Sequence, residues 1–391
     1  MTDDKTAEKT VTKEEYRRAL DAVMRLCACA VNGEIPDADW IRGMDLDLLY
    51  KAAKQHLLTA VVGYALESAG IHDHAFLQAK AKAVRKLGLM DVEMAGLFEK
   101  MEQAGIWYMP LKGTVLKDYY PAYGLRQMAD HDILFDAKRA DDVKAIMTEM
   151  GFISENFGAG NHDCYYKKPV CNFEMHRSLF GVGHETKMQE YYSDIKARLI
   201  SEEGSKYGYH FSPEDFYIYM IAHEYKHYSG GGTGIRSLLD TYVYLNKVTL
   251  DMEYVAREAE KLGIREFEEI NRSLSFHIFA DGIALEDLPE KEADMLSYVQ
   301  RSGTYGSMEN NIKNRMKRAV GKSGKVTAGI RMKYYLNRLF PRQELLYPWY
   351  PLAKYKVLIP LVWVYRILVI AVVRRKKVLG EVRIVEKQEK I

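Results

Sequence analysis

The chain has 391 residues, of which 48% are hydrophobic and 28% are charged. This composition excludes a disordered chain and a small disulfide-stabilised protein, and the length predicts about two to three domains. The formal net charge is only +2, yet residues 311–391 hold 20 Lys and Arg against 4 Asp and Glu, so this tail carries +16 and the preceding residues carry −14. The asymmetry indicates either an anionic partner for the tail or packing of the tail on the acidic body.

Residues 1–104 are expected to form an N-terminal helical region. Apolar side chains recur at helical spacing from Tyr16 to Cys27, and further helical runs are predicted over residues 46–68, 74–89 and 90–104. The first twenty residues are charged and contain no apolar stretch typical of a secretory signal. The four cysteines form no C-x-x-C pair, which favours reduced thiols and a cytoplasmic protein.

The pattern changes over residues 105–180, where a compact α+β core is predicted. A helix is expected over residues 140–150, and short apolar segments predict strands at 106–109, 131–135, 152–155, 163–168 and 170–176. The fold class is therefore α+β, with a small mixed sheet embedded between helical regions.

Helices return in a predicted C-terminal helical domain over residues 181–302. Four helices are expected there, at residues 214–227, 234–246, 251–261 and 265–279. Residues 303–391 form the basic tail, whose first part, 303–325, is rich in Gly, Ser, Asn and Lys and is predicted to be an exposed loop.

Three carboxylates form the candidate catalytic centre. Asp130 and Asp132 are two positions apart, so in a strand their side chains would project from the same face. Glu174 is expected on a neighbouring strand, where it shares a face with Asn172 and His176. Carboxylates this close repel one another unless a cation lies between them, and oxygen ligands of this kind suit Mg²⁺ or Mn²⁺. The set predicts metal-dependent phosphoryl or nucleotidyl transfer, and an exposed acidic strand end is the structural alternative.

Positive and flexible residues near these acids are candidates for holding phosphate. Gly113 allows close approach of a ligand to the backbone, and the amides of Gly113 and Thr114 open a predicted helix. Lys112 and Arg126 are weaker candidates that would neutralise charge.

The stretch Pro110–Phe135, with its L-K-G, Y-P, R and D-x-D motifs, resembles the uncharacterised nucleotidyltransferase family. The resemblance is expected to continue through Glu174-Met175-His176 and His223–Arg236 into the Phe340-Pro341 and Tyr347-Pro348 tail, and so to cover most of the chain after about residue 90. It departs from the superfamily pattern in two places, with Gly-Thr in place of Gly-Ser and with His131 between the aspartates. His131 should face the other side of the sheet, where it needs a hydrogen-bond partner.

This resemblance implies a polymerase-beta-like core and transfer of NMP from ATP or another NTP to a hydroxyl acceptor, with release of pyrophosphate. It implies that Asp130, Asp132 and Glu174 are the metal ligands and that Gly113 and Thr114 lie at the phosphates. A catalytically silent, membrane-associated adaptor with the same fold is an alternative function.

The sequence His223-Glu224-Tyr225-Lys226-His227 matches H-E-x-x-H, which suggests a zinc-dependent hydrolase as another alternative. No glycine-spaced third histidine follows it. We instead interpret His223, Lys226, His227 and Arg236 as candidate contacts to the acceptor or the polyphosphate. For Arg236 the alternative is an i,i+4 ion pair with Asp240.

The tail contains an apolar run, Val357–Val373, interrupted by Pro360 and Arg366 and flanked by cations. It is short for a membrane span, and peripheral contact through residues 354–377 at the inner face of the membrane is one interpretation. Aromatic residues suited to an interface surround it, namely Tyr347, Trp349, Tyr350, Tyr355, Trp363 and Tyr365. Packing on the body is the second interpretation, and nucleic-acid binding by residues 313–342 is the third.

Overall fold

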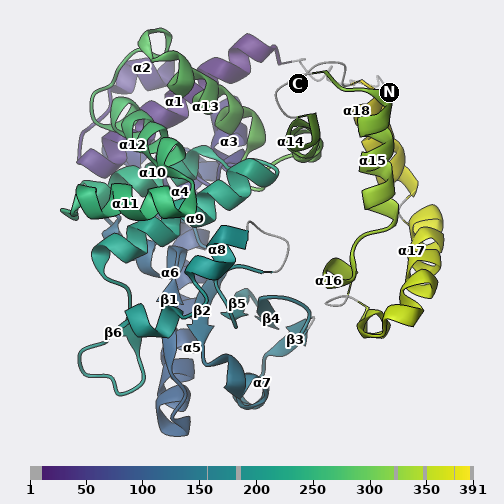
Figure 1. The fold of residues 1–391 in the computed structure, drawn as a ribbon. Helices are drawn as coiled ribbons and strands as arrows, with labels where there is room; N and C mark the ends of the chain where they lie inside the picture. Colours follow the sequence, from purple (N-terminus) through teal and green to yellow (C-terminus); the bar gives the residue numbers. More distant parts are fainter. Residues whose placement is uncertain are drawn as a thin grey trace, which may run out of the picture.

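The structure is a computed structural model that describes residues 11–155, 157–181, 186–320, 325–346, 350–373 and 375–387. The protein is a mostly helical α+β protein with a five-stranded mixed sheet in its middle and helices on both sides of it, as the sequence predicts (Figure 1). The proposed division into four parts stays a prediction.

The N-terminal region consists of helices whose starts are set by capping side chains. Thr12 forms a capping box with Glu15, and Asp37, Asp45 and Asp73 cap the starts of three later helices. The predicted run over 46–68 is two helices, because the chain turns at Leu57 with φ 54°. The predicted runs over 74–104 are instead one continuous helix. The helices are α1 (Lys13–Asn32), α2 (Ala38–Arg42), α3 (Leu46–Gln55), α4 (Thr59–Ser68) and α5 (His74–Ala104).

The sheet has the strand order β1-β2-β5-β4-β3, in which β2 and β5 are parallel and the other pairs are antiparallel. Its elements are β1 (Tyr108–Leu111), α6 (Gly113–Leu116), β2 (His131–Phe135), α7 (Ala140–Glu149), β3 (Ile153–Glu155), β4 (His162–Lys167) and β5 (Cys171–His176). The first strand begins two residues later than predicted and includes Pro110. This topology places β2 and β5 side by side at the centre, where the predicted carboxylates lie.

The two faces of the sheet differ in character. One face carries Ile133, Phe135, Phe173 and Met175, which form an apolar core with side chains of α5 and α7. Alternation along the same strands points Asp132, Glu174 and His176 to the opposite face. That face looks toward the C-terminal helices, so its polar groups line the space between the two parts of the protein.

The helical domain shares one large apolar core with α1, α3 and α4. Its elements are α8 (Thr186–Tyr191), β6 (Ile200–Ser201), β7 (Tyr209–His210), α9 (Pro213–Gly230), α10 (Ile235–Leu245), α11 (Met252–Leu262), α12 (Arg265–Phe279) and α13 (Glu290–Ser302).

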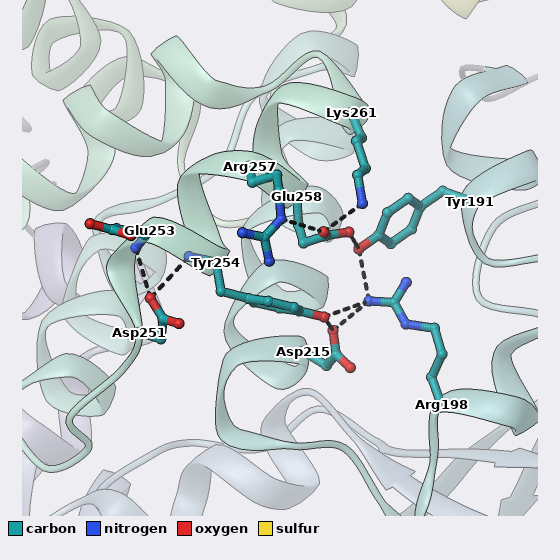
Figure 2. A network of polar contacts seen from close by, with 9 residues as sticks. All are labelled: Tyr191, Arg198, Asp215, Asp251, Glu253, Tyr254, Arg257, Glu258 and Lys261. Carbon is teal, nitrogen blue, oxygen red and sulfur yellow. Dashed lines mark hydrogen bonds and ion pairs between the residues drawn. The ribbon is translucent and has the colours of Figure 1, made fainter.

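A polar network joins α8, α9 and α11 on one side of this domain (Figure 2). Arg198 donates to the hydroxyl of Tyr191 at 2.8 Å and also pairs with Asp215. The Tyr254 hydroxyl donates to Asp215 at 2.9 Å, and that of Tyr191 donates to Glu258 at 2.8 Å. The network fixes the position of α9, the helix that carries the H-E-x-x-H sequence.

The prediction of an exposed loop over residues 303–325 is wrong, because α14 (Met308–Val320) lies within it. Its apolar positions Ile312 and Met316 are four residues apart and are buried against Val385 of the tail. Cations lie among these apolar residues and give the segment a polar composition, so composition alone does not reveal the one-sided apolar pattern. The chain continues as an arm formed by α15 (Ala328–Leu339), α16 (Gln343–Leu346), α17 (Ile359–Val373) and α18 (Arg375–Glu386), which lies beside the body with α14 between them (Figure 1). Among the described residues, no helix combines the length and apolarity needed to cross a membrane.

Candidate active site

A polar cavity of about 330 Å³ lies between the sheet, α9, α10 and the turn before α14. Every predicted site residue except Thr114 lines it: Lys112, Gly113, Arg126, Asp130, Asp132, Glu174, His223, Lys226, His227 and Arg236. Residues separated by more than a hundred positions therefore meet around one space.

The carboxylates come from two adjacent parallel strands. Asp132 lies directly opposite Glu174 in the register of β2 and β5. Strand β2 begins at His131, as predicted, so Asp130 precedes the strand and the alternation argued for Asp130 and Asp132 does not apply to it. Asp130 lies at the end of the preceding loop and still faces the same cavity.

Asp132 is buried and has two basic partners. Lys112 Nζ lies 2.7 Å and His176 Nε2 lies 2.8 Å from Asp132 Oδ1. Burial alone would raise the pKa of Asp132, but these two partners outweigh it and hold the pKa well below its usual range. Lys112 itself has φ 49° and ψ −123°, a conformation that costs a non-glycine residue about 1–3 kcal/mol. The backbone is thus held in an unfavourable conformation at the point where the lysine meets this carboxylate.

Asp130 is compensated only in part, because the charges of Lys112 and Arg236 lower its pKa by less than its surroundings raise it. Burial first, and then the negative charges of Asp132 and Glu174, raise its pKa to about 6. A half-buried acid that resists ionisation beside two other acids indicates a site short of positive charge. A divalent cation would supply that charge.

The donor atoms fit such a cation. One oxygen or nitrogen from each of Asp132, Glu174 and His176 lies within 4.8 Å of the others. The donor atoms of a second group, His162, Cys164 and Glu174, also lie within 4.8 Å of one another, and His162 and Cys164 belong to the neighbouring strand β4. The oxygen donors suit Mg²⁺ or Mn²⁺, whereas an imidazole donor suits ions such as Zn²⁺ or Fe²⁺.

Thr114 does not line the cavity. Its hydroxyl accepts the Asp132 backbone N–H at 3.1 Å and lies 3.1 Å from His131 Nδ1. His131 faces the other side of the sheet, as predicted, and its Nε2 lies 3.2 Å from Asp91 of α5. Thr114 therefore joins the β1–α6 turn to β2 and helps to hold Asp132 in place.

Arg126 is buried and bound to Asp240 of α10. Its Nε and Nη2 donate to the two carboxylate oxygens, both at 2.8 Å. The sequence suggested Arg236 as the partner of Asp240, and this is wrong, because Arg236 Nη1 donates to the carbonyl of Gln127 at 2.9 Å. The Asp240 carboxylate neutralises Arg126 and fixes the core to the helical domain.

Two cations of the cavity remain without a carboxylate partner among the described residues, namely Lys226 and Arg236. Burial, followed by the charge of Lys112, lowers the pKa of Lys226 to about 8. Burial, followed by the charge of Arg126, lowers the pKa of Arg236 as well. Both shifts reflect positive charge that an anionic ligand would compensate.

The H-E-x-x-H helix places His223 Nε2 3.2 Å from His227 Nε2. Glu224 is buried and accepts a hydrogen bond from Asn271 at 2.9 Å. In the part of the chain that the structure describes, the two groups able to hold a metal include neither histidine. The geometry therefore gives the zinc hydrolase no support.

Sequence reasoning missed several contributors to this site. Strand alternation placed His176 beside Glu174 but gave it no role. Nothing local marks Asp240 as the partner of a residue 114 positions earlier. Thr304 and Tyr305 also line the cavity, from a segment that was predicted to be loop.

The model of one protein family, described as uncharacterised nucleotidyltransferase, matches residues 42–280, which is more than half of the chain. No curated protein and no solved structure matches the chain. The match begins earlier than residue 90 and ends before the tail. The expected extension of the resemblance to Phe340-Pro341 and Tyr347-Pro348 is therefore wrong. Tyr347-Pro348 also lies outside the described residues. The chain belongs to the uncharacterised nucleotidyltransferase family.

Proposed function

We propose that the protein is a metal-dependent nucleotidyltransferase that moves NMP from an NTP to a hydroxyl acceptor and releases pyrophosphate. The observation that carries the proposal is the convergence of Asp130, Asp132 and Glu174 in one polar cavity that is also lined by Lys226 and Arg236, which have no carboxylate partner among the described residues. Family membership supports the same class of reaction.

Asp132, Glu174 and His176, whose donor atoms lie within 4.8 Å of one another, would hold the divalent cation. Asp130 lines the same cavity outside this group and would be a further ligand. A bound cation of this kind polarises the phosphoryl group and balances the charge that develops on it. Lys112 and His176 keep Asp132 ionised, so this ligand is ready at any physiological pH.

The triphosphate would extend from the carboxylates toward α9 and α10, where Lys226 and Arg236 line the wall. Gly113 also lines the cavity, and its missing side chain leaves room for the Arg126 guanidinium, because a Cβ there would lie 2.2 Å from Arg126 Nη1. His223 and His227 lie on the same wall as Lys226 and would contact the acceptor. The acceptor oxygen forms the new bond to the α-phosphorus, the bond to the β-phosphate breaks, and pyrophosphate leaves. Glu174 would take the proton of the acceptor hydroxyl.

Purified protein should be incubated with each α-³²P-labelled NTP, Mg²⁺ or Mn²⁺, and a cell lysate as the source of acceptor. The proposal predicts acid-stable label on one class of molecule and at least a hundredfold loss in Asp132→Asn and Glu174→Gln. Glu155→Gln is the matched control, because Glu155 is an exposed acid on edge strand β3 of the same sheet. Equal labelling by wild type and both site variants would contradict the proposal.

The silent adaptor is separated from the enzyme by ligand binding. Each NTP with Mg²⁺ should raise the melting temperature of the wild type but not of Asp130→Ala/Asp132→Ala. An absence of any response in the wild type would favour the adaptor.

A further inference from the structure

We propose that the arm formed by α15–α18 binds the surface of an anionic lipid bilayer, with α17 lying in the headgroup region parallel to the membrane. This inference concerns residues beyond the family match, which ends at residue 280, and does not depend on the catalytic activity.

The first observation is an apolar stripe along α17. Leu361, Val364, Leu368 and Val372 are spaced by three or four residues, which places them on one face of α17, and Val357 lies in the 3-10 turn just before the helix. Each of them is 56–83% exposed. More than half of all exposed large apolar side chains in the described residues lie on this arm, from Met332 onward. Contiguous exposed apolar surface of this kind marks a contact site for a protein or a membrane.

The second observation is that the polar groups of α17 point away from this stripe. Arg366 Nη1 donates to the carbonyl of Leu339 at the end of α15, at 3.3 Å. Trp363 Nε1 donates to the carbonyl of Pro341 at 3.1 Å, and its neighbour Val362 is buried against Leu346. The charge that interrupts the apolar run in the sequence is therefore used inside the arm, and the exposed face of the helix is left without it.

The third observation is the position of the exposed cations. Lys354 and Lys356 precede α17, Arg375 follows it, and all three are exposed. A helix with an apolar face and cations at both ends matches an anionic bilayer surface, where each Lys or Arg adds attraction to the headgroups. A second copy of this arm, packed on the stripe, would bring the same cations face to face. Self-association is therefore disfavoured as the interaction that buries the stripe.

The length of the helix decides how it would lie. Fifteen residues rise about 22 Å, whereas the hydrocarbon layer is about 30 Å thick. The helix therefore fits along the interface and does not fit across the bilayer. Tyr355 and Tyr365 are exposed near the stripe and suit the headgroup level, while Tyr347 and Trp349 lie outside the described residues.

The test is co-sedimentation of the full chain with vesicles of phosphatidylcholine alone and of phosphatidylcholine with phosphatidylglycerol. We expect binding to the anionic vesicles that is at least tenfold weaker in Leu361→Gln/Leu368→Gln. Val92→Gln/Ile153→Gln is the matched control, because both residues are apolar and exposed but lie on the body. Lys354→Ser/Lys356→Ser should weaken binding to anionic vesicles, and this difference should disappear at high salt.

Three results would overturn the proposal. The first is failure of the wild type to bind anionic vesicles, and the second is equal binding by the stripe variant and the wild type. The third is a wild-type dimer in solution that Leu361→Gln/Leu368→Gln converts to a monomer while neither protein binds vesicles, which would assign the stripe to a second copy. Circular dichroism and a melting curve for each variant establish that a loss of binding does not come from unfolding.

Discussion

The Arg126–Asp240 pair is expected to be the strongest polar link between the sheet core and the helical domain. Both side chains are 8% exposed, the two hydrogen bonds are 2.8 Å long, and the Tyr120 hydroxyl donates a third bond to Asp240 at 2.8 Å. Removing one partner of a buried pair leaves the other charge without compensation, which typically costs about 3–5 kcal/mol. We therefore expect Asp240→Leu to lower the free energy of unfolding by that amount.

A double-mutant cycle isolates the pair from other effects of substitution. Arg126→Met and Asp240→Leu are made singly and together, and urea unfolding is followed by circular dichroism and by tryptophan fluorescence. The double variant should be more stable than the sum of the single losses predicts, by at least about 2 kcal/mol, because two apolar side chains replace two charges. The pair Arg17–Glu14 is the control, since its side chains are 54% and 52% exposed, and it should show a coupling below about 1 kcal/mol.

Additive losses would refute this reasoning. If Asp240→Leu costs less than about 1 kcal/mol and the cycle shows no coupling, the pair is as well solvated as a surface ion pair. The contact between the core and α10 would then be looser than the structure describes. Coincidence of the two spectroscopic transitions is needed for the comparison, because a chain of this length can unfold in steps.

Four further predictions follow from the same cavity and its surroundings. Burial raises the pKa of Glu224 from 4.5 to about 7. The stability that this side chain contributes is therefore complete below pH 4.5 and is lost as the pH rises through 7. Between pH 5.5 and pH 8, the melting temperature of Glu224→Gln should fall less than that of the wild type. Lys226→Met should weaken NTP binding about tenfold or more in calorimetry, and wild-type binding should weaken above pH 8, where Lys226 loses its proton. Gly113→Ala would place a Cβ 2.2 Å from Arg126 Nη1, so it should lower the melting temperature, and it should do so less in an Arg126→Met background. Removal of divalent cations with EDTA should abolish NTP-induced stabilisation, and the addition of Mg²⁺ or Mn²⁺ should restore it.

The sheet and its carboxylates could be predicted from the sequence because their signals are local. Short apolar segments marked β2 and β5, and strand alternation placed Glu174 on a face with His176. The fold class follows from the order of such segments, and it is confirmed. Local reasoning supplied most of the residues that line the cavity and the bounds of β2, whereas β1 lies two residues later than predicted.

Partnerships across long sequence distances could not be predicted. The choice of Arg126 over Arg236 as the partner of Asp240 depends on how α10 packs against the loop before β2, and no local pattern encodes that packing. The helix α14 was missed for a related reason. Its apolar positions are buried against residues that include Val385, more than sixty residues later, so composition alone indicates a polar loop.

Pairing also changes how the charges of the cavity are to be counted. By composition the body is acidic, yet Asp132 is already compensated by Lys112, and Arg126 is already compensated by Asp240. The groups left to act on a ligand are Asp130 and Glu174 on one wall and the cations of α9 and α10 on the other. A triphosphate alone would meet the two carboxylates with an excess of negative charge, and burial makes such an excess expensive. Burial, and then the charges of Asp132 and Glu174, already raise the pKa of Asp130 without any ligand. Nucleotide and divalent cation should therefore enter this cavity together, because neither wall alone balances the charge of a triphosphate.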